Sequence, residues 1–346
     1  MLQNYFKQTK TLESTINKSM EWLDSHKIIS SDIDKALIGF NEIQFAIPTF
    51  GGSGDDFTTI KPWHYIFFEA EQDLDSSILL LLSAFYKDSF RAIRSFLELQ
   101  IFALYNFVNK DEVSFQDWFS GKKQTPKIQV LLQALEDKST AFKRLNEKTK
   151  WSEEVKTLYK ELSGFMHTQG ATYTHTSLRS SNQTVFSEDG IKLGTSLLLK
   201  AVRLAGMGFA VNFPMSFQPL PLFDKFAFNQ PTGGFLDDGQ VNRVKLIFPK
   251  NLLSDIAEIC LSNEDANALA EGVRSMSDLT ENEILDSLKE TIENDEFKNS
   301  KKEIIKMLSN NEFDKAIAIV LTAQRAVIRA INGILYNPFY EVKKDR

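Results

Sequence analysis

The sequence has little cysteine, little histidine and no excess of positive charge, and each shortage argues against a class of function. Its single cysteine, Cys260, cannot form a disulfide within the chain or supply the thiolates of a cysteine-rich zinc site. The formal charge is −6, with acidic and basic residues interspersed, so no overall field draws the chain onto a phosphate backbone. We therefore predict a protein of the reducing cytoplasm whose contacts with nucleic acid, where they occur, are local.

Long uncharged apolar runs are also scarce. The run within residues 76–90 is short, and the apolar segment 193–213 carries Lys200 and Arg203 in its middle. A membrane-spanning helix needs about 20 apolar residues and tolerates central charges poorly. Residues 1–23 show helical spacing rather than the continuous apolar stretch of an export signal. These features predict no contact with a membrane.

Helical periodicity and phenylalanine are abundant. The chain has 28 phenylalanines among 346 residues, which predicts an aromatic-rich core. Apolar residues recur at helical spacing over 4–25, 31–46, 127–145, 152–166 and 193–211. Residues 63–109 contain neither glycine nor proline and predict one long helix, or two. The predicted fold is all-α, a multi-helix bundle with a long central helix.

Loop-forming residues are gathered in a few stretches that mark boundaries. Residues 48–62 and 170–192 predict loops, the second one a loop or a loose hairpin. Five of the nine prolines lie within 212–249, which predicts an irregular arm rich in proline and phenylalanine, with a short strand at 243–248.

The composition changes again after Pro249. There the pattern is charged and helical, with Thr280 and Glu283 spaced as a capping box. We predict three parts: a helical bundle over 1–211, the arm over 212–249 and a C-terminal helical subdomain over 250–346.

A charged stripe follows one side of the predicted helix at 80–105. At 100° per residue, about a third of the circumference holds Lys87, Asp88, Arg91, Arg94, Ser95 and Glu98. In one interpretation the stripe meets solvent along a narrow seam, with Arg94 and Glu98 as an i,i+4 ion pair. In the other it lines an internal cleft, where the two arginines form an anion site.

Two of the four histidines, His167 and His175, lie where the helix at 152–166 is predicted to end. Their separation fits no standard zinc spacing. Histidine titrates near neutral pH, so His167 is a candidate general acid–base residue. Alternatively, it interacts with the helix dipole and the last carbonyl groups, as histidines near helix C-termini commonly do.

No metal site or cofactor is predicted. Four acidic residues, Glu69, Glu71, Asp73 and Asp75, lie close together in the sequence. Alternate residues of a helix point to different sides, so the four cannot converge on one ion. Their position near the start of a helix is explained by the helix dipole.

Three segments together carry a resemblance to a known family. These are "FRAIRSFLEL" at 90–99, a tryptophan and a glycine at 118 and 121, and "YKELSGFMHT" at 159–168. Over about residues 75–170 the chain resembles the HEPN superfamily of bacterial helical proteins. The resemblance implies a helical bundle that cleaves RNA without a metal, using an arginine and a histidine, in toxin–antitoxin or phage-defence systems.

The resemblance also implies roles for individual residues. The superfamily's usual motif has an arginine just before the histidine, where this chain has Glu161 and Leu162. The arginine would therefore have to come from Arg91 or Arg94, on the long helix packed alongside. The predicted catalytic residues are His167, Arg91, Arg94 and Glu98, and the predicted binding residues are Lys87, Tyr159, Ser163 and His175.

Three functional classes stay open. An enzyme acting on RNA or a nucleotide predicts that His167, Arg91 and Arg94 converge in one cleft. A non-catalytic scaffold predicts docking of a protein partner or a second copy through an exposed apolar patch on the arm. That patch would comprise Phe213, Phe217, Phe223, Phe226 and Phe228. A small-molecule binder predicts a pocket between helices.

Overall fold

The computed structural model describes most of the chain. It covers residues 2–47, 63–178, 185–229 and 234–293, with isolated residues between 302 and 320. Within these ranges every regular element is a helix, and the single β interaction is an isolated bridge between Leu220 and Asp237. The all-α prediction is confirmed. The predicted loop at 48–62 and most of the chain after Glu293 lie outside the described residues.

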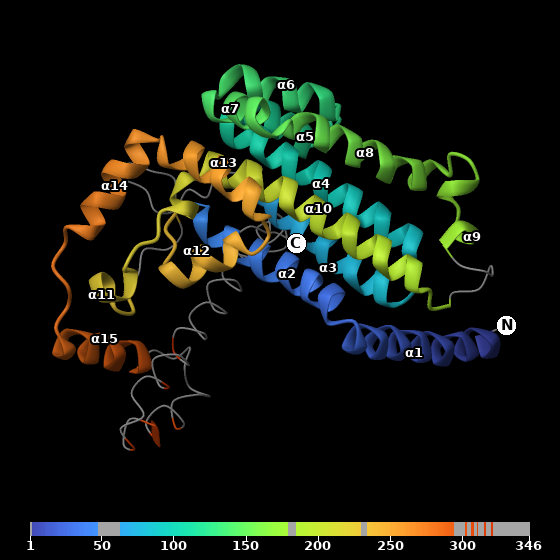
Figure 1. Cartoon of the computed structure of the whole chain (residues 1–346), viewed down its shortest axis with the longest axis horizontal. Coiled ribbons are helices and arrows are strands. Elements are labelled where there is room, and N and C mark those ends of the chain that lie inside the picture. The colour runs from blue at the N-terminus through green and yellow to red at the C-terminus, as the bar shows by residue number, and fades with distance from the viewer. Residues whose placement is uncertain are drawn as a thin grey trace, which may run out of the picture.

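The helices form a packed bundle, and a group of shorter helices continues from one end of it (Figure 1). In chain order they are α1 Leu2–Ser25, α2 Lys27–Ala46, α3 Trp63–Leu82, α4 Tyr86–Asn109, α5 Glu112–Phe119, α6 Ile128–Lys138, α7 Thr140–Thr149, α8 Trp151–His167, η1 Ala171–Tyr173, α9 His175–Leu178, α10 Glu188–Asn212, η2 Pro214–Phe217, α11 Leu222–Phe226, α12 Asp238–Lys245, α13 Lys250–Leu261, α14 Glu264–Arg274 and α15 Glu281–Glu293.

The central helix of the bundle is α10, which packs against α2, α4, α8 and α13. It is long and apolar enough to cross a membrane by length and composition, and 78% of its most apolar window is buried inside the described structure. Such burial is also found in the core helices of soluble proteins. The predicted absence of membrane contact stays a prediction.

The stretch 63–109 forms two helices rather than one. The helix α3 ends at Leu82, and Ala84 in the turn after it has a left-handed φ of 58°. The amide of Phe85 donates to the carbonyl of Leu80 at 2.9 Å. This is the hydrogen-bond pattern of a Schellman cap. The chain reverses there, and α4 packs back along α3. The turn contains no glycine or proline, the residues that usually mark a helix end in sequence.

Aromatic rings from four helices meet in the core. Phe40 of α2 lies 5.3 Å from Phe67 of α3 and 5.2 Å from Phe96 of α4, measured between ring centroids. Phe67 also lies 4.9 Å from Phe209 of α10. All four side chains are almost fully buried. The aromatic-rich core is therefore present, and it joins the central helix to its neighbours.

The arm at 212–249 is more helical than predicted. It contains η2, α11 and α12, and the predicted strand at 243–248 is instead the end of α12 and the turn after it. An Asp237–Gln240 capping box starts α12, and Val241 and Val244 point into the core. The apolar residues in "RVKLIF" therefore follow helical rather than strand geometry.

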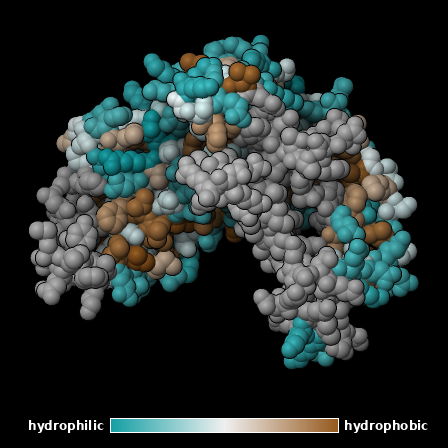
Figure 2. All heavy atoms as spheres, turned by 180° about the vertical axis from the view of Figure 1, so that it is seen from behind, coloured by the Kyte–Doolittle hydropathy of each residue, from teal (hydrophilic) through white to brown (hydrophobic). Residues whose placement is uncertain are grey.

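The predicted apolar patch on the arm is wrong. Phe217 and Phe228 are each only 4% exposed, and Phe213, Phe223 and Phe226 are half-buried. Seen from behind, hydrophilic side chains predominate along the top edge of the described surface, and apolar ones gather mainly at the lower left, with a smaller group at the right (Figure 2). The three most exposed large apolar side chains among the described residues, Ile28, Leu79 and Val113, lie outside the arm. Within the arm, Leu246 is exposed, but it is not one of the predicted phenylalanines.

The helix α13 continues the main core past Pro249. It packs against α7 and α10, and the buried Cys260 thiol lies 3.2 Å from the carbonyl oxygen of Ala210. Burial raises the pKa of that thiol, so it is inert at neutral pH. Further along, the Thr280 amide donates to Glu283 at 2.7 Å and the Glu283 amide lies 3.4 Å from the Thr280 hydroxyl, as the predicted capping box requires. The division into three parts stays a prediction.

The left-handed turn at Ala84 leads to a test of backbone strain. Ala84→Gly removes a Cβ that costs about 1–2 kcal/mol in the left-handed region, and it loses a buried methyl worth about 0.8 kcal/mol. The stability should therefore stay level or rise. The matched change Ala103→Gly, at an equally buried position inside α4, loses both the methyl and about 1 kcal/mol of helix propensity. Urea denaturation measures both changes. Equal losses of unfolding free energy in the two variants would contradict the left-handed conformation assigned to Ala84.

Candidate functional site

The helices α4 and α8 lie side by side, and most of the predicted site residues are on this seam. Contacts pair Lys87 with Thr168, Arg94 with Ser163, and Glu98 with Tyr159. The two helices therefore run antiparallel, and the start of α4 meets the end of α8. Two acidic residues in the first turn of α8, Glu153 and Glu154, suit the helix dipole.

Arg94 is the centre of a hydrogen-bonded network on this seam. Its Nε donates to the Ser163 hydroxyl at 3.0 Å, its Nη2 donates to the Tyr159 hydroxyl, and its Nη1 lies 3.3 Å from a Glu98 carboxylate oxygen. The Tyr159 hydroxyl in turn donates to Glu98 at 3.2 Å. The side chains of Arg94 and Glu98 are only 17% and 23% exposed. The predicted Arg94–Glu98 ion pair is present, and the predicted binding residues Tyr159 and Ser163 accept hydrogen bonds from the same guanidinium.

The protonation of Tyr159 is fixed by this environment. Burial, and to a smaller extent the negative charge of Glu98, raise the pKa of the Tyr159 hydroxyl, although Arg94 opposes the effect. The phenol therefore stays protonated, and it accepts from the guanidinium while it donates to the carboxylate. This order of donors and acceptors holds α8 in one register against α4.

Lys87 joins the start of α4 to the end of α8. Its side chain is buried, and its ammonium donates to the hydroxyl of Thr168, the left-handed residue that ends α8. No carboxylate among the described residues forms an ion pair with it. Arg91 behaves differently, since its guanidinium pairs with Asp88 of the same helix at 2.7 Å and is 44% exposed. The structure therefore places Lys87 inside the seam and Arg91 at its outer edge.

His167 is the last residue of α8 and is exposed. It follows Ser163 by one helical turn, and its imidazole makes no hydrogen bond to any residue the structure describes. Both interpretations of this histidine, an acid–base group and a helix-terminal cation, agree with its place. His175 begins the short helix α9. Thus Arg94, Glu98, Tyr159 and Ser163 come together, whereas His167 and Arg91 lie on the exposed edge.

The acidic residues of α3 do not assemble a metal site within the described ranges, where no group of three potential ligands occurs. Burial raises the pKa of Asp73, and a hydrogen bond from Ser95 of α4 partly offsets that rise. Burial, with a smaller contribution from Glu69, raises the pKa of Tyr65 to about 12. Asp73 and Glu69 thus take part in separate local contacts.

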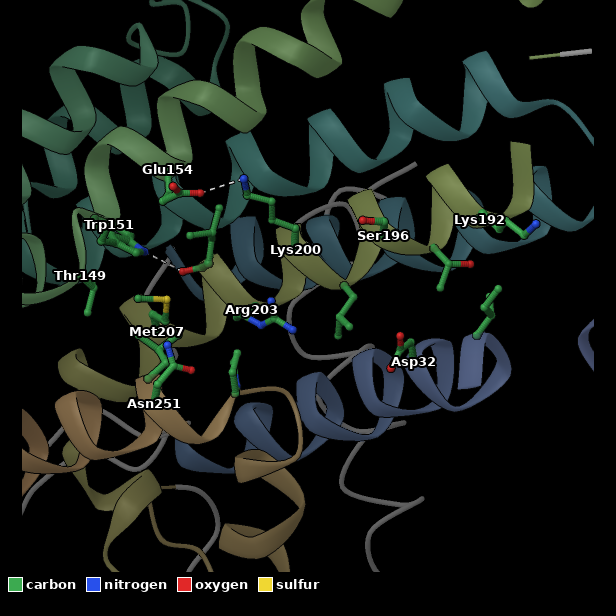
Figure 3. Close-up of a pocket in the computed structure, with 16 residues that line it drawn as sticks. Asp32, Thr149, Trp151, Glu154, Lys192, Ser196, Lys200, Arg203, Met207 and Asn251 are labelled. Carbon is green, nitrogen blue, oxygen red and sulfur yellow. Dashed lines mark hydrogen bonds and ion pairs between the residues drawn. The ribbon is translucent and has the colours of Figure 1, made fainter. Parts of the chain in front are cut away.

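A second group of charged residues lines a cleft between α2, α10 and α13, with a volume of about 600 Å³. Its residues include Asp32 of α2, Glu154 of α8, Asn251 of α13, and Lys192, Lys200 and Arg203 of α10. Figure 3 shows Arg203 extending from α10 toward Asp32. From the sequence, Lys200 and Arg203 were interpreted only as charges that interrupt an apolar run. Their spacing with Lys192 and Ser196 puts all four on one side of an otherwise apolar helix, and this pattern could have predicted a polar cleft there.

Comparisons with protein-family models, with curated proteins and with solved structures gave no match. The resemblance to the HEPN superfamily stays a prediction.

The hydroxyl of Tyr159 provides a test of the network. Tyr159→Phe removes the hydroxyl that accepts from Arg94 and donates to Glu98, while their direct ion pair remains. It should lower the free energy of unfolding by about 0.5–1.5 kcal/mol. Because the pKa is raised in the folded state, the stabilisation linked to the protonated phenol is full below the ordinary pKa of 10.0 and is lost as the pH rises through the raised value. Urea denaturation at pH 7 and above pH 10 measures both effects.

Tyr173→Phe is the matched control, because the Tyr173 ring packs on Phe165 while its hydroxyl bonds to no residue in the described ranges. Its stability should equal that of the wild type. If the two phenylalanine variants were equally stable at pH 7, the network would not hold the seam together.

Proposed function

We propose that this chain is a HEPN-like helical effector that cleaves RNA at the α4–α8 seam without a metal ion. The observation that carries the proposal is the Arg94 network, which fixes the face of α8 one turn before His167. A catalytic histidine needs such a rigid support, because small displacements from productive geometry are costly in rate.

The seam favours a division of roles among the predicted residues. Arg94 and Glu98 are positioning residues, since their polar atoms are already engaged by each other and by α8. His167 and Arg91 are exposed and free to meet a substrate. Arg91 would exchange its exposed partner Asp88 for a phosphate, which a guanidinium binds through two parallel hydrogen bonds.

The proposed chemistry uses the ribose 2′-hydroxyl. The His167 imidazole takes the proton of that hydroxyl, and the 2′ oxygen bonds to phosphorus as the bond to the 5′ oxygen breaks. The imidazolium then returns the proton to the leaving 5′ oxygen. The products are a 2′,3′-cyclic phosphate and a 5′-hydroxyl end. Arg91 stabilises the charge that develops on the phosphate oxygens.

Docking of a protein partner through the arm is not favoured, because none of its five candidate phenylalanines is exposed. A homodimer or a partner that binds elsewhere stays a prediction.

Incubation of the purified chain with mixed cellular RNA tests the proposal. The wild type should release fragments ending in 2′,3′-cyclic phosphate, and it should leave DNA of the same sequence intact because DNA lacks the attacking hydroxyl. His167→Ala should reduce the rate by about 10²–10⁴-fold, the usual contribution of general acid–base catalysis. Arg91→Gln should reduce it as well.

The controls are His26→Ala and Arg144→Gln, two exposed positions outside the seam. Both should keep the wild-type rate, and thermal unfolding should show that all four variants fold. A wild type without activity on RNA, or a fully active His167→Ala protein, would overturn the proposal.

A further inference from the structure

The cleft on α10 is formed by one face of that helix. Lys192, Ser196, Leu199 and Arg203 follow one another at intervals of four, three and four residues, so they share a side of the helix. The facing wall comes from α2 and α13. A volume of about 600 Å³ is in the range of small-molecule sites, which run from roughly 300 to 1,000 Å³. The cleft shares no residue with the α4–α8 network.

Two of the three cations that line the cleft are already neutralised. Lys200 pairs with Glu154 at 2.8 Å, and Lys192 pairs with Glu188 at 3.3 Å while lying 5.6 Å from the centre of the Trp22 ring. On the opposite wall, Asp32 pairs with Lys35 at 2.8 Å.

Arg203 differs from both lysines. Its Nε donates to the carbonyl oxygen of Ile247 at 2.9 Å, which anchors the guanidinium. Among the described residues, none offers it a carboxylate at ion-pair distance, and none accepts a hydrogen bond from its Nη groups. Burial lowers the pKa of Arg203, and the more distant charge of Asp32 only partly opposes that effect. The Nη donors of this half-buried guanidinium are therefore free to bind an anion in the cleft.

Apolar side chains also line the cleft. Leu199 and Leu252 are half-buried, and Leu204 and Met207 are buried beneath them. The Thr195 hydroxyl, on the same wall, is buried and has no hydrogen-bond partner within the part of the chain that is described. The cleft therefore combines one guanidinium with free donors, a set of apolar side chains, and other charged groups that are already paired. This combination suits a ligand with an anionic head and an apolar or aromatic body.

We infer that this cleft binds a small amphipathic anion. The carboxylate or phosphate oxygens of the ligand accept hydrogen bonds from the Nη groups of Arg203, and its apolar body lies against Leu199 and Leu252. The guanidinium suits either headgroup, because its fork of N–H donors matches both geometries.

Isothermal titration calorimetry with two pairs of probes tests this assignment. Octanoate is compared with octanol, and adenosine monophosphate with adenosine, so each pair differs in the anionic head. At least one anion should bind with one-to-one stoichiometry and at least tenfold more tightly than its neutral counterpart. The pair that shows this difference tells whether the ligand resembles an alkyl carboxylate or a nucleoside phosphate. Binding of neither anion, or equal binding of the neutral probes, overturns the inference.

Variants locate the binding. Arg203→Gln should weaken the bound anion at least tenfold, whereas Arg144→Gln, at an exposed arginine outside the cleft, should not change it. Because Arg203 also supports the carbonyl of Ile247, thermal unfolding checks the fold of the first variant. Leu199→Trp gives an independent test, since it fills the cleft and leaves Arg203 in place. Leu199→Trp should abolish binding. If either Arg203→Gln or Leu199→Trp binds the anion as tightly as the wild type does, the assignment is overturned.

Discussion

The burial of α10 is the constraint on which the rest of the structure depends. This helix is apolar over most of its girth, so it is stable only when other helices cover it, and α2, α4, α8 and α13 do so. Several glycines of α10 allow close approaches, and Gly206 and Gly208 are two of them. A Cβ on Gly206 would lie 2.6 Å from the Cδ1 atom of Ile247, and one on Gly208 would lie 2.5 Å from a Cδ1 atom of Leu104. A larger residue at either place would push a neighbouring side chain out of the core.

The polar side of α10 is not covered in the same way. Lys192, Ser196 and Arg203 cannot enter the core without a partner, and the walls that α2 and α13 provide do not close over them. The cleft is the space that results. The α4–α8 seam solves the same problem in another way, because Tyr159, Ser163 and Glu98 satisfy the guanidinium of Arg94 within the interface. Of these two half-buried arginines, Arg94 has all three guanidinium nitrogens engaged, whereas Arg203 keeps free donors.

Both proposed sites handle anions in a chain whose formal charge is −6. Long-range attraction cannot concentrate an anionic substrate around such a molecule, so binding has to rely on short-range hydrogen bonds from a few placed cations. Arg91 and His167 offer such groups at the surface, and Arg203 offers them inside a cleft. The two places differ in access, which suits a polymer at the first and a small ligand at the second.

The sequence by itself determined the helical class, the extent of α8 to within one residue at each end, and the Thr280–Glu283 cap. It predicted α10 too, but placed its start five residues late, at 193 instead of Glu188. It also gave the Arg94–Glu98 pair as one of two interpretations of the charged stripe. All these features depend on residues within one or two helical turns. The tertiary structure alone decided the left-handed reversal at Ala84 and the helical course of 243–248. Short apolar runs fit a strand and a buried helix equally well, so packing chooses between them.

The hydrogen-bond partners that Arg94 and Arg203 find on other helices could likewise not be predicted from the sequence. Ser163 lies 69 residues from Arg94, and Ile247 lies 44 residues from Arg203. Periodicity shows which side of a helix a residue occupies, but it carries no information about which distant helix will cover that side. That choice is made by the burial of apolar surface over the whole bundle, which no local stretch encodes.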